Sequence, residues 1–218
     1  MPDSTEKGVK SMFSIIEEKY AWRPGSTFTT HKPDTIVIHH ALHPNCTAQD
    51  IHRWHLNNGW KGIAYHYYIR KNGLIYRGRQ EHHQGGHLLG SENKNAIGIC
   101  LEGVYTDYKN LTEKSVPEVQ LAALVWLCND IKTRWNIKSI KRHADYPSAI
   151  NEEKDCPGRY FPWNRFMAMI SDPNAVYKHI IQKHCKFHNP DGVWKVVDTH
   201  PYADAFYMQW ANSYKTPG

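Results

Sequence analysis

The chain has 218 residues, of which 40% are hydrophobic and 22% are charged, a composition typical of a globular protein with one main domain and room for an appendage. No apolar run approaches the length that a helix needs to cross a bilayer. The formal net charge of +6 favours a polyanionic partner, either nucleic acid or a cell wall that bears teichoic acid, but a mildly basic surface without any partner fits equally well.

The N-terminus and the cysteines indicate a compartment. The first residues, MPDSTEKGVKSMFSII, place acidic residues and a lysine where a secretory signal peptide has a basic start and an apolar core. We therefore expect the protein to stay in the cytoplasm until another event releases it. The five cysteines, at positions 46, 100, 128, 156 and 185, show no paired spacing, so we expect free thiols.

The N-terminal half alternates predicted helices and strands. Residues 12–22 (MFSIIEEKYAW) predict an amphipathic helix ahead of the main domain, and a loop then leads to an apolar strand over residues 35–40. Thr47, with Asp50 three residues later, predicts a capping box that opens the next helix. Two β-rich runs within residues 64–79 flank Lys-Asn-Gly and predict a hairpin.

The second half continues the alternation. We expect a buried strand over residues 95–105, a long helix over 112–135, a last strand within 137–145 and a last helix over 160–170. Strands interleaved with helices predict an α/β or α+β domain, with a central mixed β-sheet flanked by helices.

Two adjacent histidines, His39 and His40, end the first apolar strand. Side chains alternate between the two faces of a strand, so these histidines point in opposite directions, and one of them at most can reach a given site. His143 closes the last predicted strand, and Cys156 follows after a loop. The proline after Cys156 favours extended backbone, which places Lys154 and Cys156 on the same face.

Two histidines and one cysteine form the ligand set of a catalytic zinc site, with three protein ligands and a fourth position for water. A structural zinc site would need four ligands, often with paired cysteines, and the sequence has no such pair. A cysteine with two histidines favours zinc over magnesium or calcium.

Four motifs carry a family resemblance: IVIHHA, WKGIAYHYYIRKNGLIYRGR, GGHLLGSENKNAIGICLEG and RHAD…KDCPG. In this order, over residues from about 35 to 166, they resemble the zinc-dependent N-acetylmuramoyl-L-alanine amidases, a family shared by phage endolysins, bacterial autolysins and peptidoglycan recognition proteins. The resemblance implies that fold, one Zn²⁺ per chain, and hydrolysis of the amide between N-acetylmuramic acid and L-alanine in bacterial peptidoglycan. A phage or prophage endolysin, or an autolysin, is the expected class.

The resemblance also implies roles for individual residues. His39, His143 and Cys156 correspond to the zinc ligands, and Tyr65 and Lys154 to the catalytic residues. Zinc lowers the pKa of a bound water to about 7. Lys154 would stabilise the oxyanion that develops on the amide carbonyl. Tyr65 would either position the water or move its proton, and the sequence leaves both roles open.

Other residues of these motifs are candidates for lesser roles. His87 matches a histidine that lines the family's substrate cleft, and Trp60 and Tyr67 either bind substrate or fill the core. Some relatives carry a glutamate where this chain has Cys100, so the chain resembles the tyrosine-using branch, and Cys100 is expected to be a buried thiol. Glu102 either orients a ligand or ends a strand.

Four more histidines are expected outside the site. His82 and His83 are expected in a solvent-exposed loop. His52 and His55 lie one helical turn apart, a spacing that can bind metal, but no third ligand is evident. We therefore expect His52 and His55 to pack and to form hydrogen bonds.

We divide the chain into an N-terminal helix and linker (1–27), a zinc amidase domain (28–170) and a helical C-terminal unit (171–218), which begins at SDPN, where Asp172 can cap a helix that starts at Pro173. In that unit Tyr202, Phe206 and Trp210 form a helical stripe. The stripe either packs on the amidase domain or belongs to an accessory unit that binds the wall or oligomerises. We favour an accessory wall-related role, because an enzyme that acts on an insoluble polymer gains from a second attachment point.

Two other classes compete with the enzyme. A non-catalytic peptidoglycan-binding protein is the first, but such members of the family typically lack the cysteine ligand, which this chain keeps at Cys156. A nucleic-acid binder is supported by charge alone, since no basic run is interleaved with aromatics. The expected partners are peptidoglycan and, through the basic surface, wall teichoic acid, without nucleic acid and without insertion into a membrane.

Overall fold

The computed structural model describes residues 13–172. Its sheet strands are β1 (Ile15–Glu17), β2 (Thr35–His40), β3 (Tyr67–Ile69), β4 (Ile75–Arg77), β5 (Ala96–Leu101) and β6 (Ser139–Arg142). The α-helices of this part of the chain are α1 (Ala48–Asn57), α2 (Glu118–Arg134), α3 (Pro147–Asn151) and α4 (Trp163–Ser171), with short 3₁₀ turns at Gly90–Asn93 and His143–Asp145.

The strands form one sheet in the order β1-β4-β3-β5-β2-β6. β3 and β4 are antiparallel, whereas β1 pairs with β4, and β5 with β2 and β3, in parallel, as does β6 with β2. The predicted mixed sheet flanked by helices is therefore confirmed. Because β2 lies between two parallel neighbours, the carboxyl ends of β5, β2 and β6 meet at one edge of the sheet.

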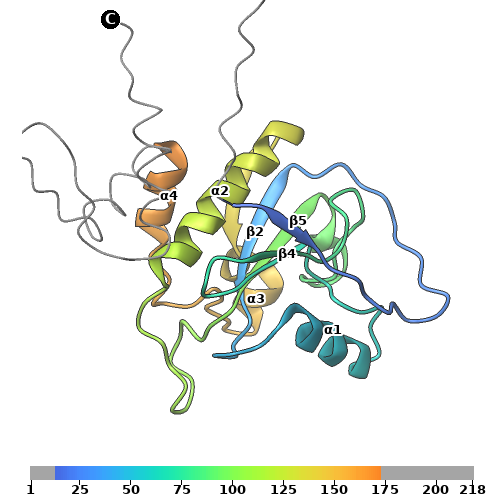
Figure 1. Cartoon of the computed structure of the whole chain (residues 1–218), viewed down its shortest axis with the longest axis horizontal. Helices are drawn as coiled ribbons and strands as arrows, with labels where there is room; N and C mark the ends of the chain where they lie inside the picture. The colour runs from blue at the N-terminus through green and yellow to red at the C-terminus, as the bar shows by residue number, and fades with distance from the viewer. Residues whose placement is uncertain (1–12, 173–218) are drawn as a thin grey trace, which may run out of the picture.

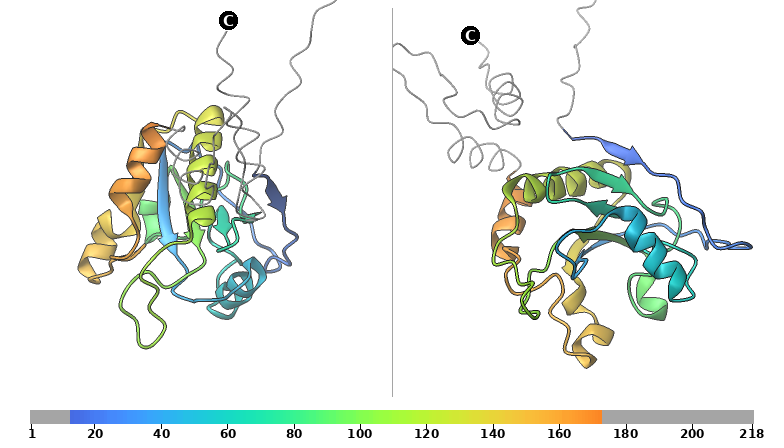
Figure 2. Two further views of the ribbon diagram at one scale, coloured as in Figure 1. Left: turned by 60° about the vertical axis from the view of Figure 1, so that its left-hand side comes forward. Right: turned by 60° about the horizontal axis from the view of Figure 1, so that its bottom comes forward.

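The two faces of the sheet serve different purposes. On β2, Ile36 and Ile38 point into the main core, which α2 and α4 cover. Val37 and His39 point to the opposite face, where Val37 packs against Leu88. α1 packs on that opposite face through a second apolar cluster. Figures 1 and 2 show α2 and α4 together, with α1 apart from them across the sheet. His39 therefore lies on the face of the sheet that α1 partly covers.

Several local predictions are confirmed. The side chain of Thr47 accepts a hydrogen bond from the backbone N–H of Asp50 (3.1 Å), and Asp50 accepts one from the N–H of Thr47 (2.8 Å), which completes the capping box of α1. The predicted hairpin is the β3–β4 pair. The predicted helix over 112–135 begins later, at Glu118, since the residue before Pro117 is driven away from helical backbone.

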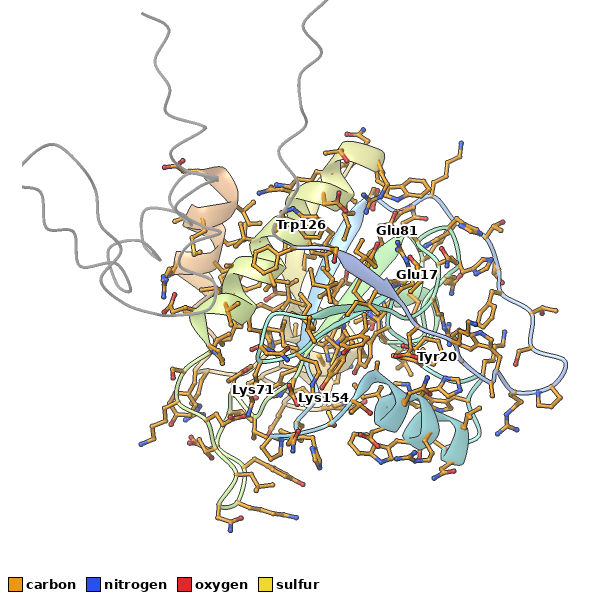
Figure 3. The ribbon with its side chains drawn as sticks, viewed as in Figure 1. Glu17, Tyr20, Lys71, Glu81, Trp126 and Lys154 are labelled. Atoms are coloured by element: carbon orange, nitrogen blue, oxygen red, sulfur yellow. The ribbon has the colours of Figure 1, made fainter. Side chains whose placement is uncertain are left out.

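The helix predicted over residues 12–22 is wrong. Ile15–Glu17 is instead the edge strand β1, paired with β4. Phe13 packs against Trp126 of α2 with ring centroids 6.0 Å apart, and Trp126 lies beside the start of β1 in Figure 3. The apolar residues fit a helical period, but the open edge of β4 provides backbone partners, and pairing there also buries Phe13.

The predicted C-terminal helices, the stripe of Tyr202, Phe206 and Trp210, and Cys185 lie outside the described residues. In the part that is described, no helix is both long and apolar enough to cross a membrane.

Candidate functional site

Three side chains from separate elements meet at the carboxyl end of β2. One ligand atom each of His39, His143 and Cys156 lies within 4.8 Å of the others, and residues 13–172 hold no second group of this kind. The sheet explains the meeting of the histidines. Ile38 is in register with Arg142 on β6, so the next residues along the two strands are His39 and His143. Their ring centroids are 4.6 Å apart.

Cys156 reaches the same point from the loop that follows α3. Its sulfur lies 3.9 Å from Nδ1 of His39 and accepts a hydrogen bond from the backbone N–H of His40 (3.4 Å). The sequence did not predict α3 (Pro147–Asn151), which shortens the path between His143 and Cys156.

The cluster fits a four-coordinate zinc ion. Zinc–nitrogen and zinc–sulfur bonds in a tetrahedral site imply nitrogen-to-sulfur separations of about 3.6 Å, close to the 3.9 Å between His39 and Cys156. Burial, and then the neighbouring histidines, holds the pKa of His39 well below its usual value, so the ring is neutral, as a metal ligand must be. Burial raises the pKa of the Cys156 thiol to about 12, so zinc binding would release a proton there.

The two adjacent histidines do point to opposite faces. His39 is 1% exposed and lies in the cluster. Nδ1 of His40 instead accepts a hydrogen bond from the backbone N–H of Tyr105 (3.1 Å) on the face of the main core. His40 therefore fixes the loop after β5 and contacts the cluster through its backbone.

His87 lies directly behind His39. Nε2 of His39 is 3.0 Å from Nδ1 of His87, and Nε2 of His87 is 3.4 Å from the carbonyl oxygen of Ala96. A carbonyl can only accept, so Nε2 of His87 donates, and its Nδ1 accepts from Nε2–H of His39. This order leaves the lone pair of His39 Nδ1 facing Cys156. The glycine at position 98 makes room, since a Cβ there would lie 2.4 Å from the His87 ring.

Tyr65 packs beside the cluster. Its ring centroid lies 5.2 Å from that of His39. Burial and then the nearby thiols of Cys100 and Cys156 raise the pKa of Tyr65 well above 10, and its hydroxyl is hydrogen-bonded to Cys100. Cys100 is the residue opposite His39 in the β2–β5 register and is fully buried, as expected. The sequence did not predict that Cys100 contacts Tyr65.

Lys154 lies at the end of the sheet near α3 (Figure 3). Its Nζ is 2.5 Å from Oε2 of Glu152, and both side chains are about half exposed. After burial, the charge of Lys154 is the next largest cause of the lowered pKa of His143. An exposed ion pair of this kind is weak, so Lys154 is free to exchange Glu152 for another anion.

Two cavities flank these residues. One of about 320 Å³ is lined by residues that include Tyr65, His87 and His143, and one of about 560 Å³ by residues that include His39 and Cys156; Lys154 and Tyr65 line both. Trp60, which is 46% exposed, lies on the wall of the smaller cavity. The cluster is therefore accessible from an open cleft.

Two predicted roles are not supported. Tyr67 is completely buried in the main core, and its hydroxyl donates to Glu81 (2.5 Å), so the prediction that Tyr67 contacts substrate is wrong. The alternation along β3 turns Tyr67 towards α2, away from the cleft. The carboxylate of Glu102 accepts hydrogen bonds from Arg70 and the N–H of Cys46, so Glu102 fixes the end of β5 rather than a ligand.

The other histidines behave largely as expected. His52 accepts from the N–H of Ile63 (3.1 Å) and His55 from the N–H of Ala64 (3.0 Å), which confirms hydrogen bonding as their role. His82 is exposed, whereas His83 is partly buried and stacks on Phe28 with ring centroids 5.3 Å apart.

The chain is similar to a known protein family and to phage endolysins. Residues 29–159 match the family model for N-acetylmuramoyl-L-alanine amidase. The chain is 38% identical over 115 residues to the endolysin of Escherichia phage T7 (51% of this chain, 75% of the relative) and 31% identical over 98 residues to that of Klebsiella phage KP32 (45% of this chain). It spans 64% of the length of the KP32 endolysin.

The fold is also similar to a solved structure, the N-acetylmuramoyl-L-alanine amidase LysC from Clostridium intestinale. The two share 35% sequence identity with a TM-score of 0.63, over 72% of this chain and 97% of LysC. The family match covers more than half of the chain and includes His39, His143 and Cys156. The chain belongs to the N-acetylmuramoyl-L-alanine amidase family.

Proposed function

We propose that the protein is a zinc-dependent amidase that hydrolyses the bond between N-acetylmuramic acid and L-alanine in bacterial peptidoglycan. The observation that supports this most is the meeting of His39, His143 and Cys156 at the floor of an open cleft, with Tyr65 and Lys154 beside them. Similarity to endolysins supports an endolysin that acts at the bacterial cell wall.

In this proposal His39, His143 and Cys156 hold zinc, which when bound supplies a Lewis acid and an activated water at neutral pH. His87 and the carbonyl of Ala96 hold His39 in the tautomer that presents Nδ1 to the metal position. The cluster lies at an edge of the sheet where three strands end, and this rigid base keeps the ligands in place.

Lys154 supplies the fixed positive charge. It lines both cavities that meet at the cluster, so it can donate to the oxygen of a carbonyl bound there and stabilise the negative charge that develops on it. The weak pair with Glu152 would be broken in the process, since a buried oxyanion is the stronger partner.

Tyr65 supplies a phenol beside the cluster. Its ring packs beside that of His39, and Tyr65 lines both cavities. We therefore assign it a role at the attacking water or the carbonyl, either orienting the group or moving its proton.

Mass spectrometry of purified peptidoglycan after digestion tests the activity, with Cys156→Ser as the matched control. We expect the wild type to release free stem peptides that start at L-alanine and to leave glycan strands intact, and we expect the variant to release none. Cut glycan or cut cross-bridges would contradict the proposed bond. Binding to peptidoglycan without any product would favour a non-catalytic recognition protein.

A further inference from the structure

The carboxylate of Glu92 joins two segments that line the cavity of about 320 Å³, residues 86–89 and 148–154. Glu92 is partly buried on the 3₁₀ turn Gly90–Asn93, which directly follows the first segment. Its Oε1 accepts a hydrogen bond from the backbone N–H of Ser148 (3.0 Å), and its Oε2 accepts one from the Ser148 hydroxyl (2.5 Å). Because Ser148 lies 56 positions further along the chain, on α3, this bridge fixes one segment to the other.

The bridge supplies an acceptor that α3 lacks. Tyr146, the residue before α3, forms no side-chain hydrogen bond with the helix, and Pro147 occupies its first position. The N–H of Ser148 is therefore the first backbone donor of α3, and Glu92 accepts from it. The hydrogen bond from the Ser148 hydroxyl lowers the pKa of Glu92, so its carboxylate is charged at neutral pH. Since Ala149 is the one buried residue of α3, packing alone holds this helix weakly.

The position of α3 determines the position of Lys154. The backbone N–H of Lys154 donates to the carbonyl of Ala149 within α3 (2.9 Å), and the N–H of Glu152 donates to the carbonyl of Ser148 (3.2 Å). Between them Glu153 has a φ of +52°, a left-handed conformation that a residue with a side chain adopts at a cost. The turn from α3 to Lys154 is therefore tight, and a shift of α3 moves Lys154 with it.

The other end of the bridge is anchored near the proposed zinc site. Asn93, the neighbour of Glu92, is 4% exposed, and its side chain accepts from the N–H groups of His87 (2.8 Å) and Leu88 (2.9 Å). His87 in turn lies 3.0 Å from His39, measured between ring nitrogens. The turn that carries Glu92 is thus fixed relative to His39, and the bridge passes this fixed position on to α3.

We infer that Glu92 is a positioning residue for the hydrolysis: through Ser148 and α3 it holds Lys154 at the place where an oxyanion develops. The inference rests on the proposed amidase function and adds a residue that neither holds zinc nor contacts the carbonyl. The side-chain ion pair of Lys154 with Glu152 is too exposed to do this, since such pairs are weak. Stabilisation of an oxyanion depends on a donor whose position is fixed beforehand, and a misplacement of about 1 Å can cost 10²-fold in rate.

The first test is a double-mutant cycle on the zinc-loaded protein with a soluble muramyl peptide. We expect Glu92→Ala to lower kcat about tenfold at unchanged KM and zinc content, because Lys154 is displaced rather than removed. In the Lys154→Ala background the same change should cost nothing further. Glu92→Gln keeps an acceptor oxygen and should recover most of kcat, and Ser91→Ala, exposed on the same turn, is the control.

The cycle separates this inference from the proposed function. An equal loss from Glu92→Ala in both backgrounds, or no loss in either, would overturn the role of Glu92 while the wild type remained an amidase. A loss that appears in KM alone would also overturn it. If the wild type cleaves no muramyl peptide, the result counts against the amidase itself, and the second test decides whether Glu92 holds Lys154.

The second test measures the position of Lys154 without activity, by amide hydrogen exchange. The N–H of Lys154 is protected by the carbonyl of Ala149, and that of Val37 by the neighbouring strands of the sheet. We expect Glu92→Ala to speed exchange at Lys154 about tenfold more than at Val37, because α3 opens locally. Equal changes at the two positions would mean a general loss of stability and would overturn the inference, as would unchanged exchange at Lys154.

Discussion

Among residues 13–172, two groups of histidines have different uses. His39 and His143 turn a ring nitrogen towards the Cys156 sulfur, where no described backbone group takes the lone pair. His52 and His66 use both ring nitrogens on the backbone: Nδ1 of His66 accepts from the N–H of Gly98 (2.9 Å), and Nε2 donates to the carbonyl of His83 (2.8 Å).

Burial and charge do not separate the two groups. Burial holds the pKa of His39, His143 and His66 below the usual value in each case, so all three are neutral near pH 7. The difference lies in what accepts or donates at each nitrogen. A neutral histidine binds metal when its free lone pair points at other ligands, and it fixes loops when both nitrogens are already used.

Replacing Cys156, the cysteine that the first group of histidines faces, should have the largest effect. Cys156→Ser replaces a soft ligand by a hydroxyl, and we expect zinc affinity to fall by more than the roughly 10–100-fold that follows loss of a residue behind a ligand. Turnover should be lost with it. Metal analysis after dialysis, with Cys128→Ser as the matched buried thiol of the main core, measures this. Full zinc content and turnover in Cys156→Ser would refute the ligand set.

Substitutions of the residues beside the proposed zinc ligands should lower the catalytic rate without lowering the zinc content. We expect Lys154→Ala to keep zinc and to lose about 10²–10³-fold in kcat, as when an oxyanion donor is removed. We expect Tyr65→Phe to keep zinc as well and to lose about 10²-fold. Zinc content and single-turnover rates measured on the same samples decide this. If either variant lost its metal, its residue would have a structural role.

His87 lies between the two groups in its contacts, because one ring nitrogen faces His39 and the other faces the backbone carbonyl of Ala96. We expect His87→Ala to weaken zinc binding about 10–100-fold, because His39 loses the partner that fixes its tautomer. Chelator competition measures the affinity, and His82→Ala, on the same loop but exposed, is the control. If His87→Ala kept its zinc affinity and raised KM, the result would instead support the predicted contact of His87 with substrate.

The sequence predicted elements whose signals are local. The capping box at Thr47, the β3–β4 hairpin and the strand that ends at His39 depend on residues close together in the chain, and the structure has all of them. The helix predicted over residues 12–22 failed because the competing signal, the open edge of β4, is 60 positions away in the chain: Ile15 pairs with Ile75.

The same distinction applies to the site. The order of the motifs predicted that His39, His143, Cys156, Tyr65 and Lys154 lie close together. In the structure all five line one cleft. The same order failed for Tyr67, where the alternation along a three-residue strand decides the face. It could not show the contact of His87 with His39, since that depends on how the fold brings together two side chains 48 positions apart in the chain.

The smallest expected effect concerns the second group and appears in stability rather than activity. The folded pKa of His66 is about 3, against 6.5 in the unfolded chain, because burial disfavours its charged form. Between these values the unfolded state binds the extra proton, so the free energy of unfolding falls as the pH drops below 6.5, by about 1.4 kcal/mol per pH unit. From pH 7 to pH 5 this amounts to about 2 kcal/mol.

Glutamine can accept and donate at the same two backbone positions without titrating, so His66→Gln should be somewhat less stable at pH 7 but should lose about 2 kcal/mol less on acidification to pH 5. Denaturant unfolding at the two pH values measures this, with the exposed His82→Gln as control, which should follow the wild type. Parallel losses in wild type and His66→Gln would mean that His66 accepts a proton without unfolding. In that case its two backbone hydrogen bonds, rather than its neutrality, would be what the fold requires.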